Sequence, residues 1–321
     1  KVRELGKKGK ISLLMKSLST VSNEEKKSLG KTYNELRLKV LDAFSVKEQD
    51  LKDIEIINKI KNENLDITLP IRPGNNDDEG KIHPISRTID SIIDIFANFG
   101  FSVETGPDIE NDFNNFTALN IPDDHPARQE HDTFYISKKD NERRKLLRTH
   151  TSPVQIRTMM NKKPPIRIIA PGRTFRSDDD ATHSPMFHQV EGLVIEKAVN
   201  MGHLKGLIKS FCEEFFEVSD LPVRFRPSYF PFTEPSAEVD IGYSKKGNAI
   251  NIGKGSDWLE VMGCGMVHPK VLINCGLDPE EWQGFAFGLG VERFAMLKYG
   301  IADLRNFYEG DIRWLDHYGF S

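Results

Sequence analysis

The stretch from residue 166 to residue 197, IRIIAPGRTFRSDDDATHSPMFHQVEGLVIEK, holds two apolar runs rich in β-branched residues, with a polar loop between them. Such runs predict two strands joined as a hairpin. Because side chains alternate along a strand, Phe187, Gln189 and Glu191 are expected on one face of the return strand. Arg176 ends the outgoing strand and can reach the same face. The opposite face is expected to carry His188, Val190 and Val194.

This set of side chains suits a nucleotide and an amino acid held together. An aromatic ring can stack on a base, a guanidinium can bind a phosphate through two hydrogen bonds, and a carboxylate can accept from an ammonium group. The simpler alternative is an exposed hairpin that carries ordinary surface charges. The hairpin alone leaves both interpretations open.

A second motif, GFAFGLGVERFAML, spans residues 284–297. Gly288 and Gly290 are expected to permit a close turn, and the apolar run after them predicts a helix that carries Arg293 about one turn in. The spacing is G-x-G-x-x-R, so the third small residue of a dinucleotide-binding fold is absent. Backbone donors at the start of a helix, together with a guanidinium, predict a site for a triphosphate tail.

A third motif, RPSYFPFTEPSAEVDI, spans residues 226–241. Phe230 and Phe232 lie on the same side of an extended segment. Two aromatics at this spacing usually belong to a core, but beside an amino-acid site they can form the walls of an aromatic pocket. Glu234 and Glu238 follow and can hold a magnesium ion through oxygen, with exposed surface carboxylates as the alternative.

The N-terminal part of the chain differs in charge from the rest. Its first 61 residues hold 15 Lys and Arg against 9 Asp and Glu, and since the net charge of the whole chain is −4, the remainder carries −10. A basic segment suggests contact with a polyanion, although a solvated helical face is an equal alternative. Apolar positions at helical spacing predict two long helices that fold back as a coiled-coil arm. The helices are expected at residues 8–18, 24–44 and 47–63.

A domain boundary is expected at residues 67–84, ITLPIRPGNNDDEGKIHP, which are rich in proline, glycine and acidic residues. This gives an arm over residues 1–66 and a second domain over residues 85–321. Ser152 followed by Pro153 is typical of a helix start, with the serine as N-cap. The later strands are mostly joined by segments too short for a parallel crossover, so we expect a mainly antiparallel sheet with helices against it.

The composition of the chain excludes some classes of protein. With 321 residues, 38% hydrophobic and 29% charged, it is typical of a globular protein. It has no apolar run near the roughly 18 residues of a membrane span and no stretch that resembles a secretory leader, so we expect a cytoplasmic protein without membrane contact. Its cysteines are odd in number and lack C-x-x-C spacing, which indicates a reducing compartment. They are Cys212, Cys264 and Cys275.

Together these motifs resemble those of the class II aminoacyl-tRNA synthetases, whose motif 2 is an arginine-bearing hairpin and whose motif 3 is a glycine turn followed by a helical arginine. Within that class, segments such as WLEVMGCGMVHPKVL and GFAFGLGVERFAMLKYGI resemble the α-subunit family of bacterial phenylalanyl-tRNA synthetases. The resemblance covers about residues 81–321. It implies an α+β fold, with an antiparallel sheet flanked by helices and an N-terminal helical hairpin.

The resemblance also implies roles for individual residues. Arg176 would bind the α-phosphate and the substrate carboxylate, Phe187 would stack on adenine, and Arg293 would bind the far phosphates of ATP. Gly288 and Gly290 would lie beside the nucleotide.

Further residues would bind phenylalanine and a magnesium ion. Its polar end would be held by His150, Ser152, Gln189 and Glu191. Its ring would face Phe230 and Phe232, with Ala286 at the end of the pocket. Glu234 would be the protein ligand of Mg²⁺.

The implied reaction is the ATP-dependent activation of phenylalanine and its transfer to the terminal ribose of tRNA(Phe). The implied partner is a larger β subunit that supplies hydrolytic editing in an α2β2 heterotetramer. Two other functions stay open from the sequence. One is a synthetase-like protein that binds tRNA or regulates without activating an amino acid, and the other is an ATP-dependent amino-acid ligase with a non-tRNA acceptor.

Overall fold

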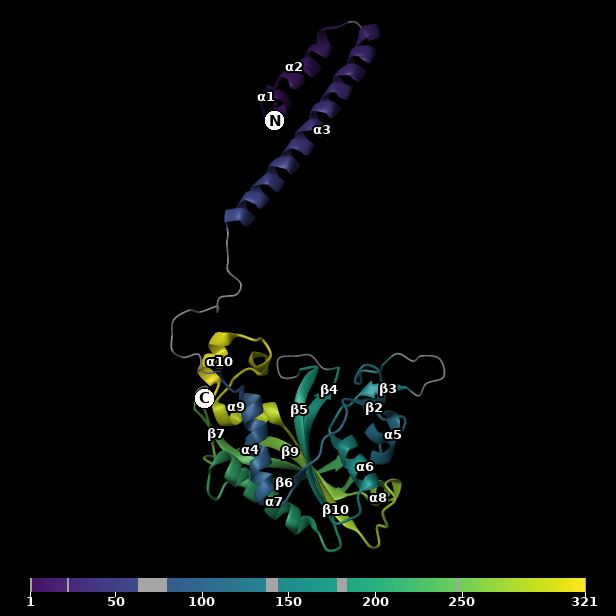
Figure 1. Ribbon diagram of the computed structural model, residues 1–321, viewed down its shortest axis with the longest axis vertical. Helices are drawn as coiled ribbons and strands as arrows, with labels where there is room; N and C mark the ends of the chain where they lie inside the picture. Colours follow the sequence, from purple (N-terminus) through teal and green to yellow (C-terminus); the bar gives the residue numbers. More distant parts are fainter. Residues whose placement is uncertain are drawn as a thin grey trace. The chain divides into compact units, whose positions relative to one another are not determined.

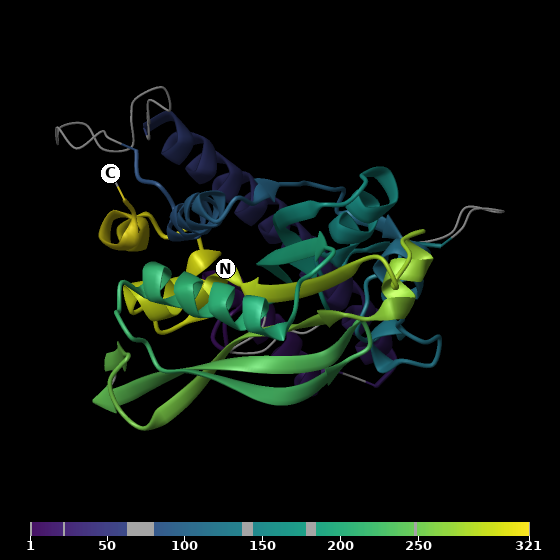
Figure 2. The same cartoon turned by 90° about the horizontal axis from the view of Figure 1, so that it is seen from below.

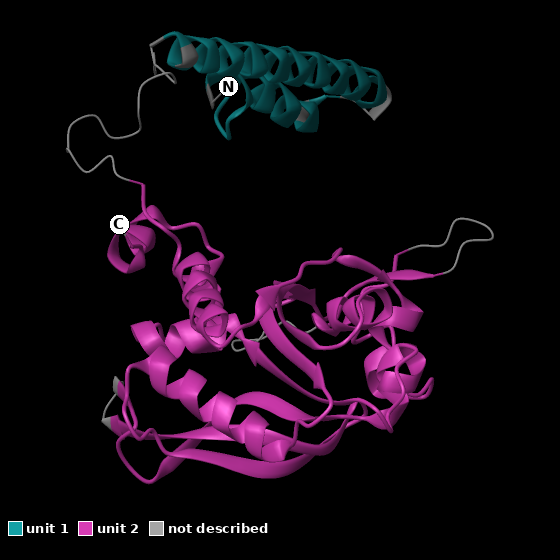
Figure 3. Cartoon of the chain, turned by 60° about the horizontal axis from the view of Figure 1, so that its bottom comes forward, with its two compact units in different colours: residues 1–78 teal, residues 79–321 magenta. Residues whose placement is uncertain are grey.

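The computed structural model describes residues 2–21, 23–62, 80–136, 144–177, 184–246 and 249–320 (Figure 1). Two compact units are present, Lys1–Asp78 and Glu79–Ser321, which we call the N-terminal unit and the core unit (Figure 3). The expected linker overlaps their boundary, and residues 67–79 of it lie outside the described residues. Within the described part of the chain, no helix is long and apolar enough to cross a membrane.

The N-terminal unit is a helical hairpin in which one helix is much longer than the others. It consists of α1 (Val2–Leu5), α2 (Lys10–Ser17), η1 (Leu18–Thr20) and α3 (Asn23–Asn62). The two sides of the hairpin lie close together, since a Cβ at Gly30 of α3 would lie 4.0 Å from a methyl carbon of Leu18. A helical hairpin was expected, but the expectation of two long helices is wrong, because α3 continues for 40 residues through the predicted break between residues 44 and 47 and the helix that pairs with it, α2, has only 8. Ser45 and Val46 lower helix propensity by only tenths of a kcal/mol each, and neither is a helix breaker such as proline.

The core unit is built on one large twisted sheet in the order β1-β4-β5-β10-β9-β7-β6, with β8 paired to β7. The pair β1–β4 is parallel and the other pairs are antiparallel, as the short connections predicted. The strands are β1 (Ser102–Val103), β4 (Ile166–Phe175), β5 (Met186–Glu196), β6 (Val223–Phe230), β7 (Thr233–Lys246), β8 (Ala249–Ile252), β9 (Asp257–Val267) and β10 (Gln283–Gly290). A second, small sheet pairs β2 (Ile109–Asn111) with β3 (Lys145–Leu147).

Helices cover both faces of the large sheet (Figure 2). One apolar cluster joins the sheet to α4 (Pro84–Asn98), α7 (Met201–Phe216) and α9 (Val291–Tyr299). A second cluster joins the opposite face to α6 (Ser152–Asn161) and α8 (Pro269–Asn274). The remaining helical segments of the core unit are α5 (Asp112–Asn115), η2 (Thr117–Leu119), η3 (Pro126–Arg128), η4 (Leu304–Phe307) and α10 (Ile312–Tyr318).

Strand β5 separates the two clusters, and its alternation is the one predicted. Val190 and Val194 are buried against the helices of the first cluster, whereas Leu193 and Ile195 are buried in the second. The first cluster is centred on Phe96 of α4, whose ring centroid lies 5.0 Å from that of Phe287 on β10. The polar residues at the start of β5 are therefore directed to defined sides of the sheet.

Two local expectations need correction. The N-cap of α6 is Thr151 rather than Ser152, which is the first helical residue and uses its hydroxyl elsewhere. The pair Gly288 and Gly290 does not form a turn, because both belong to the extended strand β10. Gly290 is the last residue of that strand and the N-cap of α9, with φ −86° and ψ 122°. The second correction follows from pairing of β10 with β5 and β9, which fixes the backbone more strongly than local propensity does.

Candidate active site

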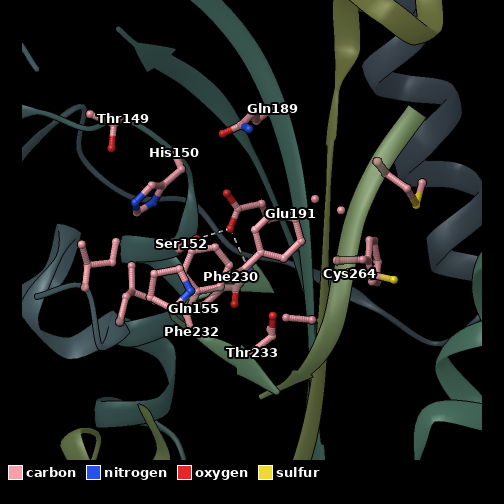
Figure 4. A pocket seen from close by; sticks show the side chains of 18 of the residues that line it. Thr149, His150, Ser152, Gln155, Gln189, Glu191, Phe230, Phe232, Thr233 and Cys264 are labelled. Atoms are coloured by element: carbon pink, nitrogen blue, oxygen red, sulfur yellow. Dashed lines mark hydrogen bonds between the residues drawn. The ribbon is translucent and has the colours of Figure 1, made fainter. Parts of the chain in front are cut away.

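A cavity of about 760 Å³ lies over one face of the large sheet (Figure 4). This volume suits a small-molecule ligand. All the residues that sequence reasoning assigned to ATP or the amino acid line it, although they come from four separate regions of the chain. They are His150, Ser152, Arg176, Phe187, Gln189, Glu191, Phe230, Phe232, Ala286, Gly288, Gly290 and Arg293.

Glu191 is the buried anchor of the cavity. Its carboxylate accepts hydrogen bonds from the Thr151 backbone N–H at 3.1 Å and from the Gln155 amide at 3.0 Å. The hydroxyl of Ser152 donates a third bond, at 2.5 Å. Burial raises the pKa of Glu191, and the bond from Ser152 opposes that rise. The start of α6 is thereby fixed against β5, and the carboxylate is available to neutralise a cationic ligand.

The floor of the cavity is a row of residues that face one another across four strands. Glu191 on β5 lies opposite Gly288 on β10, which lies opposite Gly263 on β9 and then Glu238 on β7. All four line the cavity. Because the two central positions have no side chain, a ligand can approach the backbone of the sheet between two carboxylates.

The aromatic wall is formed by Phe230 and Phe232, which flank the turn between β6 and β7. Their rings are stacked, with centroids 5.8 Å apart and planes 6° from parallel. A Cβ at Gly263 would lie 3.0 Å from the ring of Phe230, so this glycine gives the ring its place on the floor. The pair forms an apolar surface on which an aromatic side chain can pack.

Polar atoms of two buried side chains at the cavity lack a hydrogen bond of good geometry among the described residues. Neither ring nitrogen of His150 is hydrogen-bonded, and the Oε1 atom of Gln189 is also unpaired. Buried polar atoms are normally satisfied, so atoms of this kind indicate where a polar ligand binds. Burial and the nearby Arg176 guanidinium lower the pKa of His150 to about 3, so its imidazole is neutral at neutral pH.

Arg176 and Phe187 form one corner of the cavity. The guanidinium carbon of Arg176 lies 5.1 Å from the centroid of the Phe187 ring. The Nε of Arg176 donates to the carbonyl of Thr149 at 3.0 Å, which holds the side chain against the segment just before α6. Arg293 lines the same cavity from the first turn of α9. Both guanidinium groups are therefore placed at one cavity, where they can bind a polyphosphate.

Glu234, the expected magnesium ligand, is the one predicted site residue that does not line the cavity. Its side chain is 75% exposed, and its Oε2 atom lies 3.3 Å from Nε2 of His268. The described residues contain no group of three or more His, Cys, Asp or Glu placed to hold a metal ion. Mg²⁺ takes few ligands from protein and more from water and substrate phosphates. Such a site needs a carboxylate close to the phosphates, and of Glu234 and Glu260 only Glu260 lines the cavity.

Several residues of the site were not found by sequence reasoning. Glu260 on β9 lines the cavity, but it was quoted only as part of the segment WLEVMGCGMVHPKVL and was given no role. Arg148 does not line the cavity but lies just before His150, where it is buried and donates to the carbonyl groups of Arg173 at 2.7 Å and Gly106 at 3.2 Å. A Cβ at Gly172 would lie 2.1 Å from its guanidinium, so this glycine makes room for it. The sequence contained one indication of Arg148, because this residue directly precedes the Thr-His-Thr-Ser run. Its hydrogen-bond partners could not be predicted, because they come from distant segments of the chain.

Comparison with known proteins identifies relatives over the whole chain. The family described as "tRNA synthetases class II core domain (F)" matches residues 64–318, and "Aminoacyl tRNA synthetase class II, N-terminal domain" matches residues 1–60. A protein of Rhodospirillum centenum named "Phenylalanine--tRNA ligase alpha subunit" is 62% identical over 320 residues, which cover 100% of this chain and 88% of the relative. Proteins of the same name from Rhodospirillum rubrum and Methylocella silvestris are each 58% identical, and 89% of each is covered.

Solved structures share the fold at much lower identity. The crystal structure of pyrrolysyl-tRNA synthetase from Desulfitobacterium hafniense superimposes with a TM-score of 0.53 at 14% identity and covers 94% of both chains. A second structure from that organism, described as PylSc, a pyrrolysyl tRNA synthetase, gives a TM-score of 0.51 at 15% identity. It covers 70% of this chain and 73% of that structure. At this identity, the likeness shows a common fold.

Proposed function

This chain belongs to the phenylalanine–tRNA ligase α subunits and carries a class II aminoacyl-tRNA synthetase core, and from that premise we propose that the cavity of the core unit forms phenylalanyl-adenylate. The observation that carries the assignment is the cavity itself. Two arginines, an aromatic pair and a buried carboxylate line it together, although these residues lie more than 100 positions apart at the extremes. The adenylate would then transfer its acyl group to the terminal ribose of tRNA(Phe).

The amino acid would bind with its ring on the aromatic wall and its polar end at the head of β5. Phe230 and Phe232 offer the apolar surface, and Ala286 closes the pocket on β10. The unpaired Oε1 of Gln189 and the carboxylate of Glu191 are the acceptors that an ammonium group needs. The neutral imidazole of His150 adds a hydrogen bond without adding a charge.

ATP would lie across the floor of the sheet, with its base on Phe187. Arg176 is held beside that ring by the Thr149 carbonyl and would neutralise the α-phosphate. Arg293, at the start of α9, would bind the far phosphates, with Gly288 and Gly290 permitting close approach of the backbone.

The chemistry requires no nucleophilic side chain. A carboxylate oxygen of phenylalanine attacks the α-phosphorus in line, the bond to the β-phosphate oxygen breaks, and pyrophosphate leaves. A ribose hydroxyl then attacks the acyl carbon and AMP leaves. Positioning of the two substrates and neutralisation of charge that develops on phosphate oxygens account for the rate. Mg²⁺, which class II synthetases use together with ATP, would supply further neutralisation, and Glu234 and Glu260 are the candidate ligands.

A partner subunit is part of the proposal. The relatives are named as α subunits, which implies at least one other kind of subunit. An apolar pocket rejects a substrate with one extra hydroxyl group by only about a hundredfold, so tyrosine would enter at times and require hydrolytic editing. We assign editing to a β subunit in an α2β2 heterotetramer. The arm, residues 1–66, would contact tRNA, and the cytoplasm stays the predicted compartment.

The experiment is pyrophosphate exchange, measured with the partner subunit present and with each amino acid in turn. We expect exchange that depends on phenylalanine and that falls at least about 100-fold in Arg293→Ala, because a charge-assisted phosphate contact is lost. Arg305→Ala is the matched control, since Arg305 pairs with Asp303 outside the cavity. Exchange that survives Arg293→Ala, or tRNA binding without ATP binding, would contradict the proposal.

A further inference from the structure

A buried carboxylate lies next to the cavity without lining it. The side chain of Glu292 on α9 is 3% exposed. Its oxygens accept from the backbone N–H of His188 at 2.8 and 3.1 Å and lie 2.8 Å from Nδ1 of the same residue. The hydroxyl of Tyr308 donates a further bond at 2.5 Å. One carboxylate therefore connects β5, α9 and the segment after η4.

His188 and Glu292 are each next in sequence to a residue that we assign to ATP. His188 lies between Phe187 and Gln189 on β5, and its imidazole is directed away from the cavity. Glu292 directly precedes Arg293. The bonds between His188 and Glu292 thus connect the strand position next to Phe187, the proposed adenine contact, to the helix position next to Arg293, the proposed phosphate ligand. The β5–β10 ladder ends at the pair Gly290 and Gln189, so within the described residues the bonds to Glu292 continue the connection from β5 into α9.

The segment that carries Tyr308 is itself anchored to the core unit. Phe307 is buried, and its carbonyl lies 3.0 Å from Nε2 of His83, just before α4. The rings of Phe307 and His83 lie 6.0 Å apart. Burial and the Glu292 carboxylate raise the pKa of Tyr308, so its hydroxyl keeps its proton and can donate. A donor in a fixed place directs the carboxylate that it contacts.

We propose that Glu292 is a positioning residue for ATP, and that His188 and Tyr308 set its direction. The carboxylate holds the strand of Phe187 at a fixed distance from the helix of Arg293, so that base and phosphates are bound at once. Stability alone does not account for a buried carboxylate such as that of Glu292, because apolar side chains of similar volume often stabilise a fold as well or better. The inference rests on the proposed function, since it assigns the base and the phosphates to these two residues.

The experiment compares single-group variants of the complete α subunit, prepared with its partner subunit. Tyr308→Phe removes one donor from Glu292 and retains the ring. Tyr299→Phe is the matched control, because it removes a hydroxyl from the last residue of α9 that bonds Thr88 instead. His188→Ala removes the imidazole, whereas His188→Asn keeps an N–H donor close to the position of Nδ1.

We expect the KM and the directly titrated Kd for ATP to rise about tenfold in Tyr308→Phe and His188→Ala, the size of one lost bond to a buried charged group. The KM for phenylalanine should change less than about threefold, and His188→Asn should restore most of the ATP affinity. Tyr299→Phe should behave as wild type. A purely structural role predicts lower thermal stability in Tyr308→Phe with unchanged ATP constants, and that result would overturn the proposal, as would equal losses for ATP and phenylalanine.

Failure of the proposed function would give a different result. If the wild-type protein activated another amino acid, the titration of ATP alone would still separate Tyr308→Phe from Tyr299→Phe. If His188→Ala fails to fold, Tyr308→Phe and His188→Asn still decide the question, because one removes a donor and the other retains it. Wild-type protein that binds no ATP would refute both the proposed function and the positioning role of Glu292.

Discussion

Gly288 lies directly opposite Glu191 across the β5–β10 ladder, and a Cβ at position 288 would fall 3.1 Å from Cγ of Glu191. This distance is shorter than an ordinary carbon contact. Glu191 cannot easily move, because the start of α6 holds it through Thr151, Ser152 and Gln155. The open floor of the cavity therefore depends on the absence of a side chain at position 288.

Gly288→Ala should raise the KM for phenylalanine and lower kcat/KM for pyrophosphate exchange by about 10- to 100-fold, because the methyl group takes up space beside a carboxylate that cannot easily move away and that would bind the ammonium group. The backbone conformation is extended and permits alanine, so the effect comes from contact with Glu191. Gly206→Ala in α7 is the control, since a Cβ there meets nothing within 4 Å. Equal kinetics of the two variants would show that the ligand does not use this part of the floor.

Ala286→Gly tests the end of the amino-acid pocket. Ala286 and Phe232 both line the cavity and pack against the same apolar cluster, so loss of the Ala286 methyl group should open space at the far end of a bound phenyl ring. We expect exchange with para-chlorophenylalanine to rise at least about tenfold relative to phenylalanine, while Ala286→Val should weaken phenylalanine itself. An unchanged substrate range in both variants would mean that the ring points elsewhere.

His150 should make the protein sensitive to acid. Its pKa is lowered from 6.5 to about 3 in the folded state, so between these values the unfolded chain binds more protons. Stability is therefore complete above the unfolded pKa and is lost as the pH falls below about 6.5. From about pH 7 to about pH 5.5, wild type should lose about 1 kcal/mol more free energy of unfolding than His150→Gln. Parallel pH profiles in denaturant unfolding would show that the imidazole is not buried as described.

The features that sequence could predict are those with a local period. On β5, the alternation of side chains is enough to place Phe187, Gln189 and Glu191 on one face, because a strand offers only two faces. Arg293 could be assigned for a similar reason, since the apolar run around it has helical spacing. The hairpin β4–β5 followed from the short loop between two apolar runs.

Other features depend on contacts between distant segments and carry no local signal. Glu260 reaches the cavity through the register of β9 against β7, which shifts between Val239 and Asp240. Such an irregularity changes the face on which later side chains lie, and a single sequence does not show it. Glu292 looked like an ordinary helix residue, because its partners His188 and Tyr308 are supplied by other elements. The glycine turn expected before α9 was wrong for the same reason, since pairing with β5 and β9 holds β10 extended.

The last prediction concerns the N-terminal unit. Its first 61 residues carry an excess of six positive charges, and α3 exposes many of its side chains to solvent. A basic helix of this kind binds a polyanion by releasing counterions, so its contribution to affinity falls as salt rises. Deletion of residues 1–63 should weaken tRNA binding and flatten the dependence of log K on log salt concentration, while phenylalanine-dependent pyrophosphate exchange without tRNA stays near wild type. Filter binding at several salt concentrations measures the first effect. Because exchange needs only the cavity of the core unit, a comparable loss of exchange would mean that the N-terminal unit supports the core instead of contacting tRNA.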